Sequence, residues 1–174
     1  MKKGMVFQAV LFMLSVMILA GCNSLPSAAG ADVESGLTSP MSGKVIYVNS
    51  RYGFSFRLPD SWNGYSVLND SWSASKNDVM TAETGPVISI RHPLWSKKKP
   101  RQDIPVMVFT LKQWGLVADE EVRISAAPVG PSELGRNNRY VFALPPRYNY
   151  AFPEGFKEVE KIIEAKPLLV VKVK

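Results

Sequence analysis

Hydrophobic and polar residues alternate in several short segments of the chain, which is typical of strands with one buried face. Residues 54–58 (FSFRL) alternate in this way, and the Pro-Asp pair at 59–60 marks the end of the segment. Residues 104–109 and 140–144 are apolar almost throughout, which predicts strands covered on both faces. Further candidate strands of the half-buried kind lie around residues 45–47, 65–68, 88–91 and 122–126.

Helical periodicity is clear in one segment, residues 153–166, which ends before Pro167. A second helix is predicted near residues 111–117, where Gly115 weakens the pattern, and residues 60–64 are compatible with a helical turn. Many strands with few helices favour an α+β fold, with a mostly antiparallel sheet and helices on its faces. The apolar face of the helix predicted at residues 153–166 consists of Phe156, Val159, Ile162 and Ile163.

The first 21 residues have the pattern of a secretory signal peptide. Lys2 and Lys3 precede an apolar run over residues 5–20, and no charged residue follows until Asp32. A membrane-spanning helix needs about 20 predominantly apolar residues, so this run is too short for a permanent span. We therefore expect the chain to be exported and the leader to be removed.

Residues 19–22 (LAGC) closely resemble the lipobox of bacterial lipoproteins. The resemblance implies cleavage between Gly21 and Cys22 and a diacylglyceryl group on the Cys22 thiol. Two acyl chains anchor a protein stably, because each buried CH2 contributes about 0.8 kcal/mol. The expected location is the extracytoplasmic face of the cell membrane. The alternative is an ordinary signal peptide followed by a free or buried cysteine.

Composition divides the rest of the chain into a tether and one domain. Residues 22–43 begin with the lipidated cysteine, are rich in Ser, Ala, Gly and Pro, and contain no aromatic residue, so a flexible spacer is expected. Residues 44–174 form a single α+β domain, in which four tryptophans supply large apolar groups for a core. Its last segment, residues 168–174, is either an extra strand or a disordered end.

Residues 52–62 (YGFSFRLPDSW) resemble the opening of PsbP-like domains, in which a strand of the form G-F-x-F-x-x-P-x-x-W starts the sheet. In those domains a terminal helix also packs on the sheet. The resemblance implies an α/β/α sandwich and an accessory or binding role. PsbP-like proteins take part in photosystem assembly, and relatives occur as bacterial lipoproteins, but nothing in this chain indicates a photosynthetic partner.

Motifs that would name a reaction are missing from the sequence, including G-x-S-x-G, H-E-x-x-H, G-x-G-x-x-G and the P-loop. His92 is the single histidine and Cys22 the single cysteine, so a zinc site built from these residue types is not expected. We expect no metal and no cofactor. A Ser-His-Asp set or a catalytic carboxylate pair depends on geometry, which the sequence leaves open.

The densest polar cluster begins with Arg91 and His92 and continues through residues 95–103 (WSKKKPRQD). As a functional loop it offers a titratable histidine, cationic groups and an indole to an anionic or ring-bearing ligand. As a structural element it is a solvated basic turn, with Trp95 folded onto the domain and Arg91 or His92 hydrogen-bonded to the backbone, and runs of charge more often have this role. The candidate ligand-binding residues here are Arg91, His92, Trp95 and Arg101.

Two further polar clusters flank the expected strand at 140–144. Arg136 precedes this strand, and Arg147, Tyr148 and Tyr150 follow it, so these side chains are candidates for the mouth of a groove. The structural alternative is that the Pro and Asn residues nearby form turns and the tyrosines close the edge of the core.

Two functions of different classes are consistent with these patterns. The first is a non-catalytic binding or accessory module of the cell envelope, which contacts an envelope protein or an anionic envelope component. The second is a small envelope hydrolase with His92 as its base, which requires Ser, Asp or Glu within hydrogen-bond reach of that ring. The net charge of +6, about +4 without the leader lysines, suits an anionic surface. Nucleic acid is not an expected partner.

Overall fold

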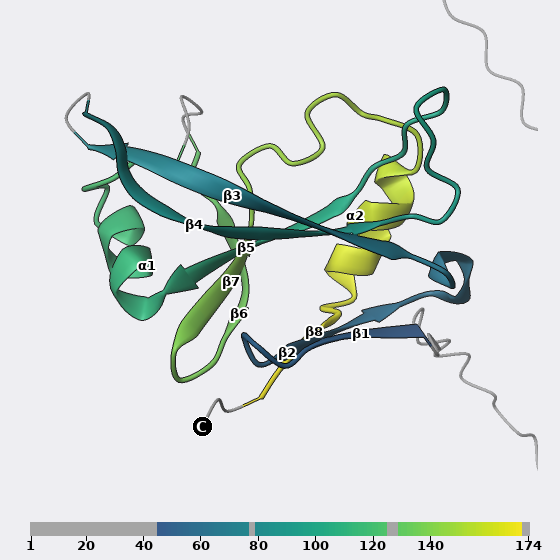
Figure 1. The fold of residues 1–174 in the computed structure, drawn as a ribbon, viewed down its shortest axis with the longest axis horizontal. Coiled ribbons are helices and arrows are strands. Elements are labelled where there is room, and N and C mark those ends of the chain that lie inside the picture. The colour runs from purple at the N-terminus through teal and green to yellow at the C-terminus, as the bar shows by residue number, and fades with distance from the viewer. Residues whose placement is uncertain (1–44, 77–78, 125–128, 172–174) are drawn as a thin grey trace, which may run out of the picture. The chain divides into compact units, whose positions relative to one another are not determined.

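The protein is an α+β fold of two antiparallel sheets and two α-helices in a computed structural model that describes residues 45–76, 79–124 and 129–171 (Figure 1). The predicted fold class is confirmed. The strands divide between two sheets, however, which their patterns did not show. The predicted leader and tether lie outside the described residues, and no helix within those residues is long and apolar enough to cross a membrane.

The smaller sheet, called sheet A here, has the strand order β1-β2-β8. It consists of β1 (Val45–Asn49), β2 (Phe54–Leu58) and β8 (Leu168–Val170). The predicted strands at both ends of the domain therefore meet in one sheet, with β2 in the middle. The side chains of Phe54, Phe56 and Leu58 point inward and are buried, as the alternation in this segment predicts.

The larger sheet, called sheet B, has the strand order β3-β4-β5-β7-β6. β5 and β7 lie next to one another inside it and are buried on both faces, as their apolar runs predict. The long hairpin of β3 and β4 forms one side of the sheet and β6 the other. The bounds are β3 (Ser66–Lys76), β4 (Val79–Arg91), β5 (Ile104–Thr110), β6 (Ser132–Arg136) and β7 (Tyr140–Leu144).

Each face of sheet B is covered by different elements, which creates two cores. On one face, β2 of sheet A and helix α2 (Phe156–Glu164) pack against Ile88, Val106 and Phe142. On the other face, residues of helix α1 (Leu111–Ala118) pack against Trp72, Phe109 and Val141. Thr110 caps α1 by accepting from the Gln113 N–H, while the Gln113 side chain accepts from the Thr110 N–H.

Several local predictions are confirmed and one is wrong. The helical turn forms as the short 3-10 helix η1 (Asp60–Trp62), and the two predicted helices appear as α1 and α2. The tail forms the extra strand β8, with residues 172–174 outside the described range. The strand predicted at 122–126 is not formed over 122–124: Arg123 makes only an isolated bridge to Ser75, and residues 125–126 lie outside the described range.

Candidate binding surface at the β4–β5 loop

The loop between β4 and β5, residues 92–103, lies beside the connection that leads from β7 into α2 (Figure 1). The two segments are held together near the start of α2. The Gln102 N–H donates to the Glu154 carbonyl at 2.8 Å, and the Gln102 side-chain amide donates to the Tyr148 carbonyl at 3.1 Å. The loop is therefore fixed to the body of the domain at its C-terminal end.

Arg91 fixes the other end of the loop. Its Nε and Nη2 atoms donate to both carboxylate oxygens of Asp103, at 3.1 and 2.7 Å. Its guanidinium group also lies over the Trp95 ring, 3.8 Å from the ring centroid. The hydrogen bonds to Asp103 raise the pKa of Arg91 above its ordinary value. This forked ion pair and the stacking contact close the base of the loop and hold Trp95 against the domain.

His92 is buried, with 4% of its surface exposed, and its ring meets the Trp62 ring edge-on at 4.9 Å. Its Nδ1 atom accepts a hydrogen bond from the Leu94 N–H at 3.1 Å. The proton of the neutral imidazole is therefore on Nε2. Burial lowers the pKa of His92 and the positive charge of Arg101 lowers it further, against smaller opposing effects of Glu158 and Glu154. His92 is thus a neutral side chain that orders the loop backbone.

Arg101 joins the loop to α2 through charge. Its guanidinium group forms ion pairs with Glu154 and Glu158, the second at 3.6 Å. Glu158 also accepts a hydrogen bond from the Ser61 hydroxyl at 2.6 Å. A Cβ atom at Gly155 would lie 3.2 Å from the Arg101 guanidinium, so glycine leaves room for this arginine. The positive charge of Arg101 is therefore paired with carboxylates of the same protein and is not available to a ligand.

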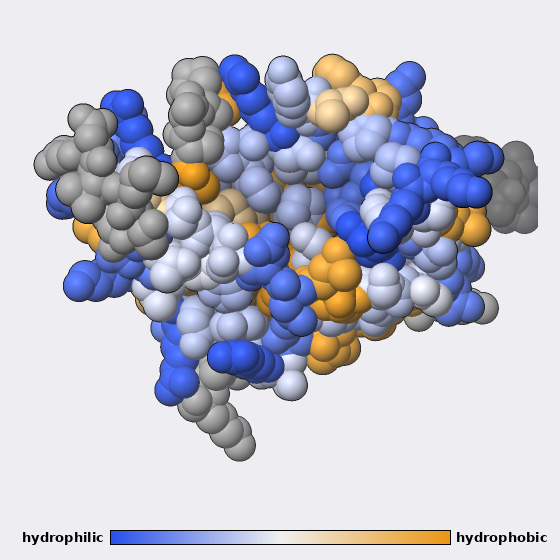
Figure 2. All heavy atoms as spheres, turned by 45° about the horizontal axis from the view of Figure 1, so that its top comes forward, coloured by the Kyte–Doolittle hydropathy of each residue, from blue (hydrophilic) through white to orange (hydrophobic). Residues whose placement is uncertain are grey.

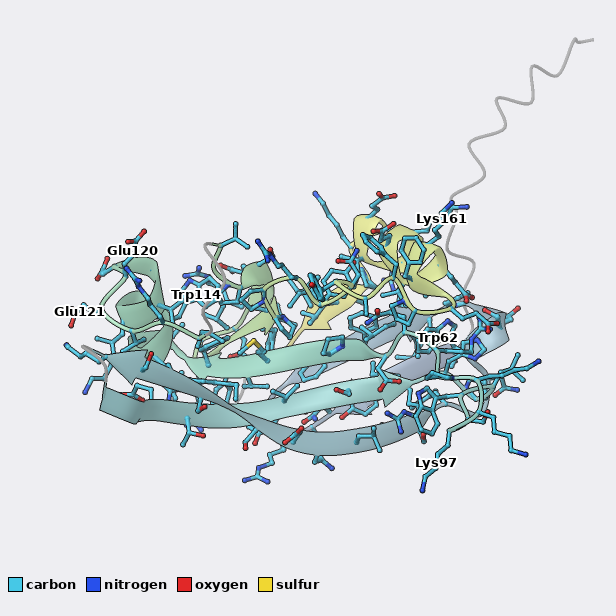
Figure 3. All side chains as sticks on the ribbon, turned by 90° about the horizontal axis from the view of Figure 1, so that it is seen from above. Trp62, Lys97, Trp114, Glu120, Glu121 and Lys161 are labelled. Atoms are coloured by element: carbon cyan, nitrogen blue, oxygen red, sulfur yellow. The ribbon has the colours of Figure 1, made fainter. Side chains whose placement is uncertain are left out.

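The tip of the loop, in contrast to its base, carries positive charges that are not paired with carboxylates of the described residues. Ser96 and Lys99 exchange backbone hydrogen bonds of 3.1 Å in both directions, which makes a tight turn. Lys97, Lys98 and Lys99, called the basic tip here, are exposed, and none of them forms an ion pair within the described part of the chain. Lys97 projects away from the ribbon in Figure 3, and hydrophilic side chains gather at this end of the domain in Figure 2.

Exposed apolar side chains occur in both segments, the β4–β5 loop and the connection that leads into α2. Leu94 is exposed in the β4–β5 loop, and Tyr150 and Phe152 are exposed in the neighbouring connection. The Phe152 ring contacts the Phe156 ring edge-on at 5.2 Å. Phe152 has a positive φ of 46°, which is unfavourable for a bulky residue. Of these apolar side chains, Leu94 lies closest in sequence to the basic tip, so the loop itself offers an apolar group beside its cationic ones.

The structure brings together only part of the predicted site. Arg91, His92, Trp95 and Arg101 share the β4–β5 loop, and the Tyr148 carbonyl contacts it. Arg147 is exposed in the connection after β7 and has a positive φ of 52°. The phenol of Tyr148 packs against the core, and burial, with smaller effects of Glu160 and Glu164, raises its pKa.

Arg136 lies apart from this loop. It is the last residue of β6 and pairs with Glu133 of the same strand. Its partner across the sheet is Val141 of β7, which in turn faces Phe109, near the Thr110 end of β5. The β4–β5 loop adjoins the Ile104 end of β5, which is roughly 20 Å away for a strand of this length. Arg136 therefore does not share a site with Arg91.

The partners that define this surface were not among the predicted site residues. Glu154 and Glu158 pair with Arg101 across more than fifty positions of sequence, and Ser61 reaches Glu158 across 97. Asp103 lies within the polar run, so its pairing with Arg91 had a weak sequence signal. Trp62, expected only as a core residue, is buried against His92. Contacts between residues so far apart in the sequence depend on the order of the strands.

The chemistry available here favours binding over proton transfer. The lone pair that His92 would use as a base accepts the Leu94 N–H. No hydroxyl or carboxylate of the described residues is hydrogen-bonded to the ring, whereas a hydrolase would need such a bond to its base. Within the same residues, no three His, Cys, Asp or Glu side chains are placed to hold a metal ion.

Comparison of the chain with models of known protein families, with curated protein sequences and with solved structures gave no match. The resemblance of residues 19–22 to a lipobox and that of residues 52–62 to PsbP-like domains therefore stay predictions. Any functional conclusion depends on the residues of this chain.

Proposed function

We propose that the protein is a lipid-anchored module of the extracytoplasmic face of the membrane that binds an anionic envelope component through its basic tip. The observation that carries this proposal is the contrast between the base of the β4–β5 loop and its tip. Arg91 and Arg101 are neutralised by carboxylates at the base, whereas Lys97, Lys98 and Lys99 are exposed at the tip.

A fixed loop supports binding because little conformational entropy is lost when a partner docks. Arg91 joins the two ends of the loop through Asp103, the buried His92 binds the Leu94 N–H, and Gln102 holds the loop to the connection before α2. Lysines on such a loop attract phosphate or carboxylate groups as point charges, and the attraction weakens as salt is added. The exposed Leu94, three residues before Lys97, would add apolar contact.

The anchor in this proposal rests on the sequence. The LAGC motif at residues 19–22 implies that Cys22 carries the lipid, and the Ser-, Ala-, Gly- and Pro-rich stretch after it implies a flexible tether. The PsbP-like resemblance of residues 52–62 belongs to the same proposal, since it implies an accessory role instead of an enzymatic one.

Photocrosslinking in intact cells tests this function. Benzoylphenylalanine at Leu94 should give adducts of raised mass, because Leu94 is exposed beside the basic tip. The same group at Ala118, exposed at the end of α1, is the matched control. Adducts at both positions alike, or at neither, would contradict binding through the loop.

A panel of ester, glycan and peptide substrates tests the hydrolase alternative directly. We expect no turnover that depends on His92, because its Nδ1 atom is engaged by the backbone. Turnover by the wild-type protein that is lost in His92→Ala, with the fold intact by circular dichroism, would favour the hydrolase instead.

A further inference from the structure

The outer face of sheet A carries exposed aliphatic side chains along both of its sides, although a sheet face in contact with water is normally polar. On β2 the outward residues follow the usual pattern, since they are Ser55 and Arg57. On β1 and β8, the strands on the two sides of β2, the outward residues do not follow this pattern. The outward residues there are aliphatic and exposed: Ile46 (51%), Val48 (66%), Leu169 (41%) and Val171 (60%).

Strand register places these side chains on the same face of sheet A, on the two sides of β2. Val48 on β1 and Leu169 on β8 both face Ser55 of the central strand, so the three form one row across the sheet. Ile46 faces Arg57 in the next row. Val171 extends the ladder beyond β8, because its N–H donates to the Gly53 carbonyl at 2.9 Å. The result is an exposed surface with aliphatic side chains on both flanking strands and the polar Ser55 and Arg57 on the central strand between them.

We propose that this face of sheet A rests on the surface of an anionic lipid bilayer, with the aliphatic side chains among the lipid headgroups and Arg57 against their phosphates. This inference rests on the proposed function, because it takes the membrane to be the one that the lipid anchor enters. Exposed apolar patches of this kind mark protein or membrane contact sites.

The position of the tether supports the bilayer as the occupant. The segment between the predicted anchor and the domain ends at Val45, the first residue of β1, and β1 carries Ile46 and Val48. A flexible chain as long as the predicted tether, residues 23–43, has an average end-to-end distance of about 25 Å. Sheet A is thus tied within a short distance of the bilayer, and even a weak contact with lipid is favoured at such a local concentration.

Charge distinguishes the bilayer from a second copy of the chain. Arg57 forms no ion pair with any described residue, and a face-to-face dimer about a two-fold axis would bring its charge against that of the other copy. Anionic headgroups would neutralise the same charge. In the sequence Lys44 directly precedes β1, and Lys172 and Lys174 follow Val171, so the adjoining chain carries further positive charge.

The orientation also fits the basic tip. In Figure 1 sheet A and the end of the β4–β5 loop lie on opposite sides of the domain. With sheet A on the bilayer, the basic tip points away from the membrane and into the envelope. The two surfaces therefore serve different partners, the first lipid and the second the anionic component proposed above.

Spin labelling of the full-length protein, purified from membranes and placed in lipid vesicles, tests this proposal. Because Cys22 is the single native cysteine and is expected to be acylated, Val48→Cys introduces one free thiol. Ala118→Cys on α1, which packs on the far side of sheet B, is the matched control. The measured quantity is the collision rate of each label with a water-soluble relaxant, in phosphatidylcholine vesicles and in vesicles that also contain phosphatidylglycerol.

We expect the label at 48 to collide with the relaxant about threefold less often than the label at 118 when anionic lipid is present, because headgroups shield it. Arg57→Gln should reduce this difference. Equal collision rates in protein that floats with the vesicles would overturn the inference and leave the anchor intact. Strong coupling between two labels at 48 would show that a second copy covers the face. Protein that does not float would overturn the anchor and this inference together.

Discussion

The indole Nε1 atom of Trp72 donates a hydrogen bond to the main-chain carbonyl of Val108 at 2.9 Å, which links an outer strand of sheet B to an inner one. Pairing between β4 and β5 ends at Val87 and Met107, so this contact lies where the hairpin leaves the sheet. A Cβ atom at Gly85 would lie 2.6 Å from the indole, so only glycine allows the ring to cross β4 here.

Trp72→Phe should lower the free energy of unfolding by more than the loss of ring area alone. A buried carbonyl that loses its partner costs about 1–3 kcal/mol. Trp114→Phe is the control, because Trp114 packs in the same core and its indole makes no hydrogen bond in the described structure. Urea denaturation measures both variants, and equal losses would show that the Val108 contact contributes nothing.

The stability of the protein should fall when the pH drops below 6.5, the ordinary pKa of histidine, because the folded-state pKa of His92 is lowered. The unfolded chain then binds a proton that the folded protein does not, so the free energy of unfolding decreases with falling pH. The slope is at most about 1.4 kcal/mol per pH unit, and it vanishes below the folded-state pKa.

His92→Asn separates this effect from the other titrations. An asparagine oxygen provides an acceptor for the Leu94 N–H as Nδ1 does, but it does not titrate. Thermal unfolding just below pH 6.5 should show the decline in the wild-type protein and not in the variant. The same decline in both proteins would mean that His92 is not its source.

Arg91→Lys should loosen the β4–β5 loop. Lysine lacks the planar fork that binds both oxygens of Asp103, and it stacks less well on Trp95. Trypsin should therefore cut faster at the basic tip, with the fragments identified by mass spectrometry. Arg136→Lys, which breaks a similar fork to Glu133 at the end of β6, should leave the cutting rate at the tip unchanged. Equal acceleration by both would indicate a general loss of stability.

Sequence patterns were sufficient to predict a strand or helix where its buried face is visible in its own sequence. The apolar runs of β5 and β7 and the alternation in β2 predicted their burial correctly. The pattern did not show β6 (SELGR), because it has one large apolar residue and a glycine whose Cβ would crowd Leu168. The segment at 122–126 alternates like a strand, yet over 122–124 it makes only one bridge, from Arg123 to Ser75 of β3, so alternation alone is not enough.

The division into two sheets and the details of the loop depend on contacts between distant segments. β2 pairs with β8, more than a hundred positions later, and nothing in the alternation of either segment specifies that partner. Two alternatives were predicted for the loop, a ligand-binding loop and a solvated basic turn with Trp95 folded onto the domain, and the sequence did not show the contact between Arg91 and Trp95. Its fixation by Glu154 required α2 to be placed first.

Cys22→Ser should release the protein from the membrane or leave it unprocessed, because the thiol is the expected site of the diacylglyceryl group. Cell fractionation measures the release, and mass spectrometry of the wild-type protein measures the lipid. Ser24→Ala, two positions further on, is a control that leaves the lipobox unchanged. An unmodified Cys22 in mature wild-type protein would rule out the anchor.

The most direct measurement of the central claim is the salt dependence of binding to an immobilised anionic polymer, poly(glycerol phosphate). The test variant carries Lys97→Gln, Lys98→Gln and Lys99→Gln. The matched control removes the same charge elsewhere, with Gln in place of the exposed Lys112, Lys161 and Lys166. Lysines near an anionic surface contribute about 1 kcal/mol each, so we expect the test variant to bind on the order of 10- to 100-fold more weakly.

The control variant should bind almost as well as the wild-type protein, and added salt should weaken the wild-type protein towards the level of the test variant. Equal loss of binding in both variants would mean that net charge, and not the basic tip, attracts the polymer. Wild-type binding that is undiminished by salt and by loss of the three tip lysines would contradict the account.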